Sequence, residues 1–356
     1  MRVTIADAGG VLRRSGGRFR LRQSLRWTGT RLKEGKDRAG PVTGEGGERK
    51  ALVRPPRSFP MTQDRTDLYT RITAEIIAAI EAGAGEFRMP WHHAGTSIAR
   101  PANISSGKNY RGVNVLALWV AAEIARFENG IWGTYRQWQA REAQVRKGER
   151  GTTVVLWKQA NPARDDERAG DDDSPARRIF ARAFTVFNVA QVDGYQPEPV
   201  ALLPESERVA HAEAFIGNLG ITTVFGGPSA FYRPATDTVH MPDFGHFHEA
   251  AGFYGSWIHE NGHASGAKHR LDRDLSGRFG SASYALEEIS VEILSGMILA
   301  DLAIAHHPRP DHAAYVASWL KVLKDDPRAI FTAASKAQQA ADWMHARQPQ
   351  AAEKAA

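Results

Sequence analysis

Apolar residues recur at helical spacing along most of the chain. The first such set predicts a helix from about residue 67 to a glycine cluster at 83–85, and it consists of Leu68, Ile72, Ile76, Ile77 and Ile80. The same periodicity predicts further helices at residues 114–127, 205–219, 252–266, 282–302, 313–324 and 335–347. The C-terminal half is therefore expected to be mainly helical.

Strand-like segments flank a polar insertion in the first half. Residues 152–158 and the segment IFARAFTVFNVAQVDGY predict a β-hairpin. The insertion between them, QANPARDDERAGDDDSPARR, is acidic and interrupted by proline and glycine, and it predicts the hairpin loop. Short strands are also expected at 221–225 and 238–241.

A proline-containing stretch, QPEPVALLPESE, divides the two halves near residue 200. We therefore predict an α+β protein with a small α+β domain at residues 66–195 and a mainly helical domain at residues 205–346.

The net charge of +6 is concentrated at the N-terminus. Residues 1–60 contain 15 Lys and Arg against 5 Asp and Glu, a net +10, whereas the remainder contains 31 against 35, a net −4. Residues 1–60 have few aromatics and no sustained periodicity, so we expect a disordered extension. It is either a basic arm for nucleic acid or an untranslated stretch that precedes a start at Met61, and we favour the later start.

The chain has no cysteine, which excludes disulfides and thiolate metal sites. A metal ion would therefore need His, Asp or Glu ligands. No apolar run approaches the length of about 20 residues that a membrane helix needs, so we expect no membrane association.

The stretch WIHENGHASG contains His-Glu-x-x-His, at His259, Glu260 and His263. On a helix both histidines lie on one face and can reach one ion, and the glutamate beside them can act as general base on a water bound to the metal. Gly262, inside the motif, would allow another backbone to approach closely. The alternative is a helix whose two histidines make ordinary hydrogen bonds.

A second predicted helix, in YALEEISVEIL, places Glu288 and Glu292 four residues apart and therefore on one face. With the two histidines, Glu288 would complete a catalytic zinc site, and Glu292 would orient a ligand histidine, although these roles could be exchanged. Glu287 is expected to point away as a solvated charge. Such a site takes Zn²⁺ and also accepts Mn²⁺ or Co²⁺. The candidate groups for stabilising an oxyanion are Tyr232, His269 and Tyr284.

Tryptophans alternate with basic residues between positions 91 and 157. This pattern suits single-stranded nucleic acid, because bases stack on aromatic faces and phosphates pair with cations. The candidate DNA-binding residues are Lys108, Tyr110, Arg111, Trp132, Arg136, Arg146 and Lys147. The segment SSGKNY fails the pattern of a phosphate loop, because Ala102 and Asn109 replace the required Gly and Ser/Thr, so we expect no nucleotide cofactor.

Several stretches resemble the ArdC antirestriction family. RPANISSGKNYRGVN, WGTYRQWQ, VRKGERGTTVVLW and FTVFNVAQVDGY resemble the family's N-terminal single-strand-DNA-binding domain. AFYRPATDTVHMP, HENGHASGAKHRLDRDLSGRFGSASYALEEISVE and ASKAQQAADWM resemble its C-terminal zincin-like metallopeptidase domain. The resemblance covers about residues 66–346, and Asn261 stands where the family more often has Leu.

The resemblance implies a cytoplasmic protein that protects incoming DNA from restriction. It also implies binding of single-stranded DNA and a zinc metallopeptidase domain that acts on a protein substrate. The alternative is a non-enzymatic DNA-protecting protein whose metal site is structural or vestigial. Glu260 favours the enzyme, because a structural metal site needs no base beside an open position.

Overall fold

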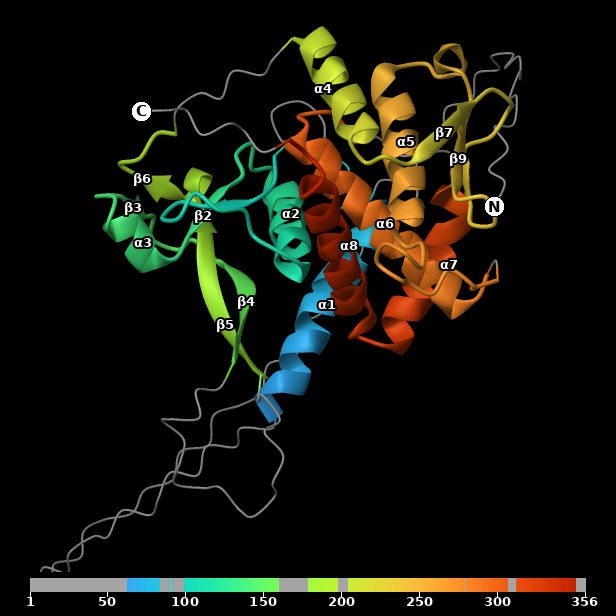
Figure 1. The fold of residues 1–356 in the computed structure, drawn as a ribbon. Helices are drawn as coiled ribbons and strands as arrows, with labels where there is room; N and C mark the ends of the chain where they lie inside the picture. Colours follow the sequence, from blue (N-terminus) through green and yellow to red (C-terminus); the bar gives the residue numbers. More distant parts are fainter. Residues whose placement is uncertain are drawn as a thin grey trace, which may run out of the picture. The chain divides into compact units, whose positions relative to one another are not determined.

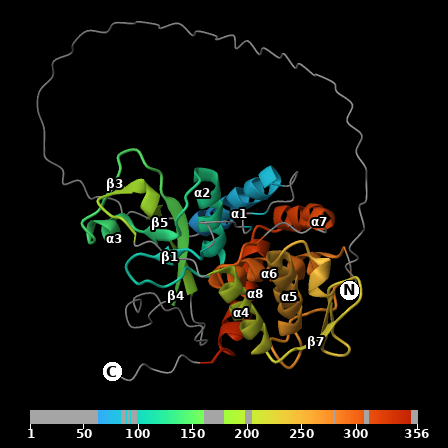
Figure 2. The same ribbon diagram turned by 90° about the horizontal axis from the view of Figure 1, so that it is seen from above.

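A computed structural model describes residues 63–83, 89, 92, 99–159, 179–197, 204–278, 280–306 and 312–349. This part of the chain has a mixed α+β fold, which confirms the predicted fold class (Figures 1 and 2). The expected N-terminal extension at residues 1–60 and the expected hairpin loop lie outside the described residues.

Helix α6 (Ala282–Asp301) is the central helix of the C-terminal part. Three helices pack against it, namely α5 (Ala250–Ser265), α7 (His312–Asp325) and α8 (Ala329–His345). Every residue of α6 from Glu287 to Ala300 is buried, because neighbouring elements cover all of its faces. Polar side chains on this stretch therefore need partners inside the protein.

The remaining helices extend the same hydrophobic core. Helix α1 (Gln63–Gly83) packs against α7 and α2 (Val113–Ala125), while α4 (Glu205–Gly217) packs against α5. The fully buried Ile72 and Ile76 of α1 belong to the same core as Ile289 of α6. Helices from the first predicted domain thus share a core with helices from the second.

A four-stranded sheet forms most of the remaining N-terminal part. Its strand order is β1 (Ala102–Asn103), β2 (Ile131–Gly133), β5 (Ile179–Asn188) and β4 (Thr152–Gln159). The pair β1–β2 is parallel and the other two pairs are antiparallel. The side chain of Asn114 joins α2 to β4, since it accepts a bond from the Val155 N–H (2.7 Å) and donates one to the Val155 carbonyl (2.8 Å).

Smaller elements complete the described part. Helix α3 (Tyr135–Gln139) precedes the short antiparallel pair β3 (Gln144–Val145) and β6 (Val192–Asp193). A second sheet has the order β7 (Thr222–Phe225), β9 (Thr238–Met241) and β8 (Phe231–Arg233), with β7 parallel and β8 antiparallel to β9. Helix α5 packs against β8 and β9. Single 3₁₀ turns lie at Val189–Gln191 and Phe244–His246.

The predicted long helices agree with the structure to within a few residues, except that α8 begins at Ala329, before the predicted start at 335. Its first two turns bury Ile330 among alanines, and alanine contributes little contrast to a hydrophobic pattern. The strands missed by prediction have two or three residues each, which is too short for alternation to be visible. Among the described residues, no helix combines the length and apolar character needed to cross a membrane.

Candidate metal centre and nucleic-acid surface

Helices α5 and α6 approach closely at Gly262, beside the candidate metal ligands. A Cβ atom at this position would lie 2.6 Å from Val291 Cγ1 and 3.1 Å from Leu294 Cδ2, both on α6. Only glycine fits such a contact without a shift of one helix. The sequence therefore brings His259 and His263 of α5 within reach of the glutamates of α6.

The three predicted ligands meet with the spacing of a metal site. The Nε2 atoms of His259 and His263 are 3.2 Å apart. The Glu288 carboxylate lies 3.6 Å from Nε2 of His259 and 3.5 Å from Nε2 of His263. Tetrahedral ligands at bond lengths near 2.1 Å would be about 3.4 Å apart, so these residues fit one divalent ion. All three side chains are buried.

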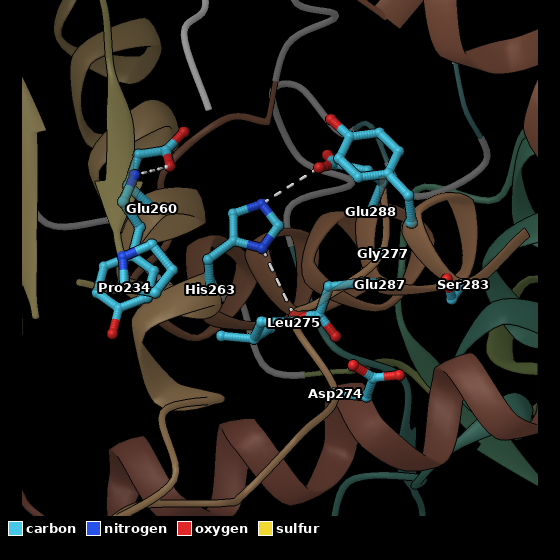
Figure 3. Close-up of a pocket in the computed structure, with 11 residues that line it drawn as sticks. Pro234, Glu260, His263, Asp274, Leu275, Gly277, Ser283, Glu287 and Glu288 are labelled. Atoms are coloured by element: carbon cyan, nitrogen blue, oxygen red, sulfur yellow. Dashed lines mark hydrogen bonds and ion pairs between the residues drawn. The ribbon is translucent and has the colours of Figure 1, made fainter. Parts of the chain in front are cut away.

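A carboxylate lies beside the remaining ring nitrogen of each histidine. Oε2 of Glu292 is 3.2 Å from Nδ1 of His259. Oε1 of Glu287 is 3.5 Å from Nδ1 of His263 (Figure 3). Glu288 faces both Nε2 atoms, whereas Glu292 faces an Nδ1 atom. This geometry favours Glu288 as the ligand and Glu292 as the orienting residue over the exchanged roles.

The expectation that Glu287 is a solvated charge is wrong. Its side chain is buried, and Arg273 donates to it from both Nε (3.1 Å) and Nη2 (2.8 Å). Burial alone would raise the pKa of Glu287, but hydrogen bonds from His263 and Arg273 outweigh it and lower the pKa to about 2. The error arose because α6 is covered on all sides, so no face of it is solvated.

Glu260 lies at the wall of a cavity of about 320 Å³ that opens beside the ligands. Figure 3 shows Glu260 across this space from Glu288, with His263 between them. Oε2 of Glu260 accepts a hydrogen bond from the backbone N–H of Tyr232 (2.9 Å) on the edge strand β8. This bond fixes the carboxylate at the cavity wall.

Two of the three oxyanion candidates line the cavity. The hydroxyl of Tyr232 donates a hydrogen bond to Asp237 (2.8 Å). Burial together with that carboxylate raises the pKa of Tyr232 to about 12. Burial, and then the charge of Glu288, raise the pKa of Tyr284 as well. Both phenols therefore keep their protons at neutral pH. His269 is exposed beside Asp237 and is not part of the cavity wall.

The candidate DNA-binding residues differ in their exposure. Lys108, Arg136 and Lys147 are exposed, and none of them forms an ion pair with another described residue. Arg111 is exposed but pairs with Asp342 of α8, and Arg146 pairs with Glu149. All five basic side chains are thus at the surface, and two already have acidic partners.

The assignment of Trp132 to the nucleic-acid surface is wrong. Its side chain is fully buried in β2, packed in the core with Leu118, so it offers no ring face to a base. Tyr110 is partly buried, and its hydroxyl accepts a hydrogen bond from Asn103 (3.0 Å). Because composition does not reveal which side of a strand faces inward, the tryptophan count was a poor guide.

An exposed aromatic residue that the sequence reasoning missed lies three positions later. Tyr135 of α3 is 42% exposed. It borders an open groove of about 560 Å³ together with Arg146 and Lys147. An accessible ring beside two cations suits single-stranded nucleic acid, although Glu149 and Asp193 line the same groove and pair with Arg146.

Comparisons with known proteins match two parts of the chain to described domain families. Residues 66–187 match the N-terminal domain of the anti-restriction factor ArdC, and residues 210–336 match a zincin-like metallopeptidase domain. The chain is 60% identical over 298 residues to an uncharacterized protein of Sinorhizobium fredii, with 82% of this chain and 97% of that protein covered. It is 35% identical over 303 residues to the DNA primase TraC of Escherichia coli; the match covers 80% of this chain but only 27% of that primase.

Two crystal structures of the antirestriction ArdC protein from the R388 plasmid share the fold at 37% identity. The metal-free form has a TM-score of 0.66 and the Mn(II)-bound form a TM-score of 0.63. Each match covers 79% of this chain, together with 97% and 98% of the respective ArdC chain. On these similarities, the chain belongs to the ArdC family of antirestriction proteins.

Proposed function

We propose that this antirestriction protein is a divalent-metal-dependent peptidase that binds single-stranded DNA and acts in the cytoplasm. The observation that carries the peptidase assignment is Glu260, a buried carboxylate fixed at the cavity wall beside the His259, His263 and Glu288 set. A structural metal site would need neither the base nor the cavity.

His259, His263 and Glu288 would hold the ion, and Zn²⁺ suits this ligand set, with Mn²⁺ or Co²⁺ as substitutes. The Mn(II)-bound form of the related ArdC protein supports a divalent metal here. When bound, such an ion supplies Lewis acidity to a peptide carbonyl and acidifies a coordinated water. Glu260 accepts the proton of the attacking water and transfers it to the leaving amine, while the Tyr232 N–H holds its carboxylate in place.

The test of the peptidase compares Glu260→Gln with the parent chain. We expect hydrolysis of an unfolded protein substrate to fall by about 100-fold or more, because general base catalysis is lost, with metal content unchanged. Antirestriction is measured in parallel, as survival of unmodified plasmid DNA entering a restricting host. Glu213→Gln is the matched control, since Glu213 accepts a bond from Tyr254 (2.8 Å) and lies outside the cavity wall. Full retention of hydrolysis by metal-loaded Glu260→Gln would reject Glu260 as the general base. Antirestriction without any hydrolysis by the metal-loaded parent chain would support the non-enzymatic alternative.

We assign DNA binding to the surface formed by Tyr135, Arg136, Arg146 and Lys147. Anisotropy titrations with a labelled single-stranded oligonucleotide test this assignment. Tyr135→Ala should weaken binding by about 1–3 kcal/mol through lost stacking. Lys147→Ala should weaken binding and reduce the slope of log affinity against log salt concentration by about one. Lys321→Ala on α7 is the control, because it removes an exposed lysine from another surface. Unchanged affinity in both test variants would reject this surface.

A further inference from the structure

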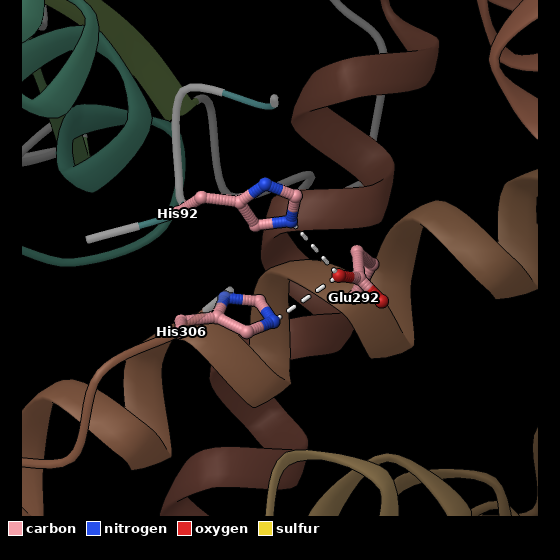
Figure 4. A group of neighbouring side chains, drawn as sticks. All are labelled: His92, Glu292 and His306. Carbon is pink, nitrogen blue, oxygen red and sulfur yellow. Dashed lines mark ion pairs between the residues drawn. The ribbon is translucent and has the colours of Figure 1, made fainter. Parts of the chain in front are cut away.

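The carboxylate of Glu292 is surrounded by three histidines beneath the metal centre. Oε2 lies 3.2 Å from Nδ1 of His259. Oε1 lies 3.2 Å from Nε2 of His306 and 3.5 Å from Nε2 of His92 (Figure 4). All four side chains are buried, and Glu292 is fully so. A buried carboxylate is stable only when nearby donors compensate its charge.

These histidines come from distant parts of the chain. His92 precedes β1 and lies in the part that matches the ArdC N-terminal domain, whereas His306 follows α6 in the zincin-like part. Eight residues after His92, Arg100 pairs with Asp301 at the end of α6 (3.0 Å) and donates to Gln338 of α8 (3.1 Å). Arg100 is thus anchored against α6 and α8.

The backbone around His92 determines which ring nitrogen carries its proton. The N–H of Met89 donates to Nδ1 of His92 at 3.0 Å. A backbone N–H can only donate, so Nδ1 is the acceptor and the proton of a neutral ring lies on Nε2, toward Glu292. His259 has the opposite arrangement, because its Nε2 faces the ligand set and its Nδ1 faces Glu292.

The position of the proton on His92 decides between two roles for the group formed by His92, Glu292 and His306. His92, Glu292 and His306 offer three ligand atoms within 4.8 Å of one another, which alone could hold a second metal ion. A ligand nitrogen must be free of its proton, which would then move to Nδ1 and oppose the Met89 N–H. His92 is therefore suited to directing its Nε2–H toward Glu292 rather than to binding a cation.

We propose that His92 and His306 are positioning residues of the metal centre. Their Nε2 atoms lie within ion-pair distance of Oε1 of Glu292, and this placement leaves Oε2 facing Nδ1 of His259, so that Nε2 of His259 is directed at the ion. This inference rests on the proposed function, since it assumes that His259 is a metal ligand. Its consequence is that the N-terminal part of the chain supports the metal centre of the C-terminal part through His92.

The test measures metal binding by the full chain, first stripped with a chelator and then titrated with Zn²⁺. In His92→Phe we expect affinity to fall by about 10-fold, the lower end of the range for losing an outer partner of a ligand, because His92 acts on His259 only through Glu292. His92→Gln, whose amide can donate to Glu292, should retain most of the affinity. His345→Phe is the control, because His345 also contacts a carboxylate of α6, Asp301 (2.9 Å), but does not contact Glu292.

A readout besides affinity separates positioning from general stability. The absorption spectrum of the Co²⁺-substituted chain should change in His92→Phe and return in His92→Gln, since it reports the geometry of the ligand nitrogens. If His92→Phe fails to fold, His306→Leu applies the same test from the other side of the carboxylate.

The outcomes distinguish this inference from the proposed function. Failure of the unaltered chain to bind any divalent metal would reject the proposed function itself. One bound ion together with unchanged affinity and spectrum in the foldable variants would reject only the positioning role. Two bound ions per chain would also overturn it, because His92 and His306 would then be ligands. We expect one ion per chain.

Discussion

Alanine in place of Gly262 would force α5 and α6 apart at the metal centre. The added Cβ would lie 2.6 Å from Val291 Cγ1, well inside van der Waals contact. Overpacking of this kind costs about 1–3 kcal/mol, while replacing a helical glycine by alanine contributes about 1 kcal/mol in the opposite direction. We therefore expect a net loss of about 0–2 kcal/mol in the free energy of unfolding, together with weaker metal binding.

A second glycine of α5 provides the matched control for Gly262→Ala. A Cβ at Gly255 would lie 3.7 Å from Leu299 Cδ1, which is an ordinary contact with the same neighbouring helix. Gly255→Ala gains the same helix propensity without the clash, so the difference between the two variants isolates the steric cost of about 1–3 kcal/mol. Denaturant unfolding of the metal-free proteins measures this difference, and zinc titration measures the effect on the ligands. Equal stability and equal zinc affinity in the two variants would refute the close-approach reasoning.

Two further perturbations follow from the ion pairs around the site. Arg273→Met should lower the free energy of unfolding, measured with denaturant, by about 3–5 kcal/mol, because it leaves the buried Glu287 without its cation. Adding Glu287→Gln should restore part of this loss. An unchanged unfolding midpoint in Arg273→Met would contradict the role of the pair. Hydrogen bonds from Arg270 lower the pKa of Asp237 below that of the unfolded chain, so this pair stabilises the protein above the unfolded pKa near 4, and the contribution is lost as pH falls through the lower folded value. The thermal stability of Asp237→Asn should therefore fall less between pH 5 and pH 2 than that of the parent chain. An equal fall in both proteins would disprove this prediction.

Helical spacing made it predictable that each pair of candidate metal-site residues shares a helix face. His259 and His263, like Glu288 and Glu292, are four residues apart, so each pair shares a helix face whatever the rest of the fold does. Gly262 indicated in addition that the two helices could approach closely. Glu287 was misjudged because its environment depends on how many neighbours cover α6, which local periodicity does not report.

Contacts between distant segments could not be predicted in the same way. His92 and His306 meet on Glu292 only after the N-terminal segment packs against α6, and neither lies in a recognisable pattern. For the DNA surface, the residue types were informative but their orientation was not. Trp132 faces the core while Tyr135, three residues away, faces solvent.

Helix α6 places three carboxylates inside the protein, and this links the concentration of free metal to the stability of the folded chain. Glu287 is compensated by Arg273 and Glu292 faces histidines, whereas Glu288 faces the nitrogens that would share an ion with it. Binding of that ion to the folded chain alone would add about 2.7 kcal/mol of stability at a free concentration 100 times the dissociation constant. A cell short of metal is therefore expected to lose the protein itself to unfolding and proteolysis, along with its activity.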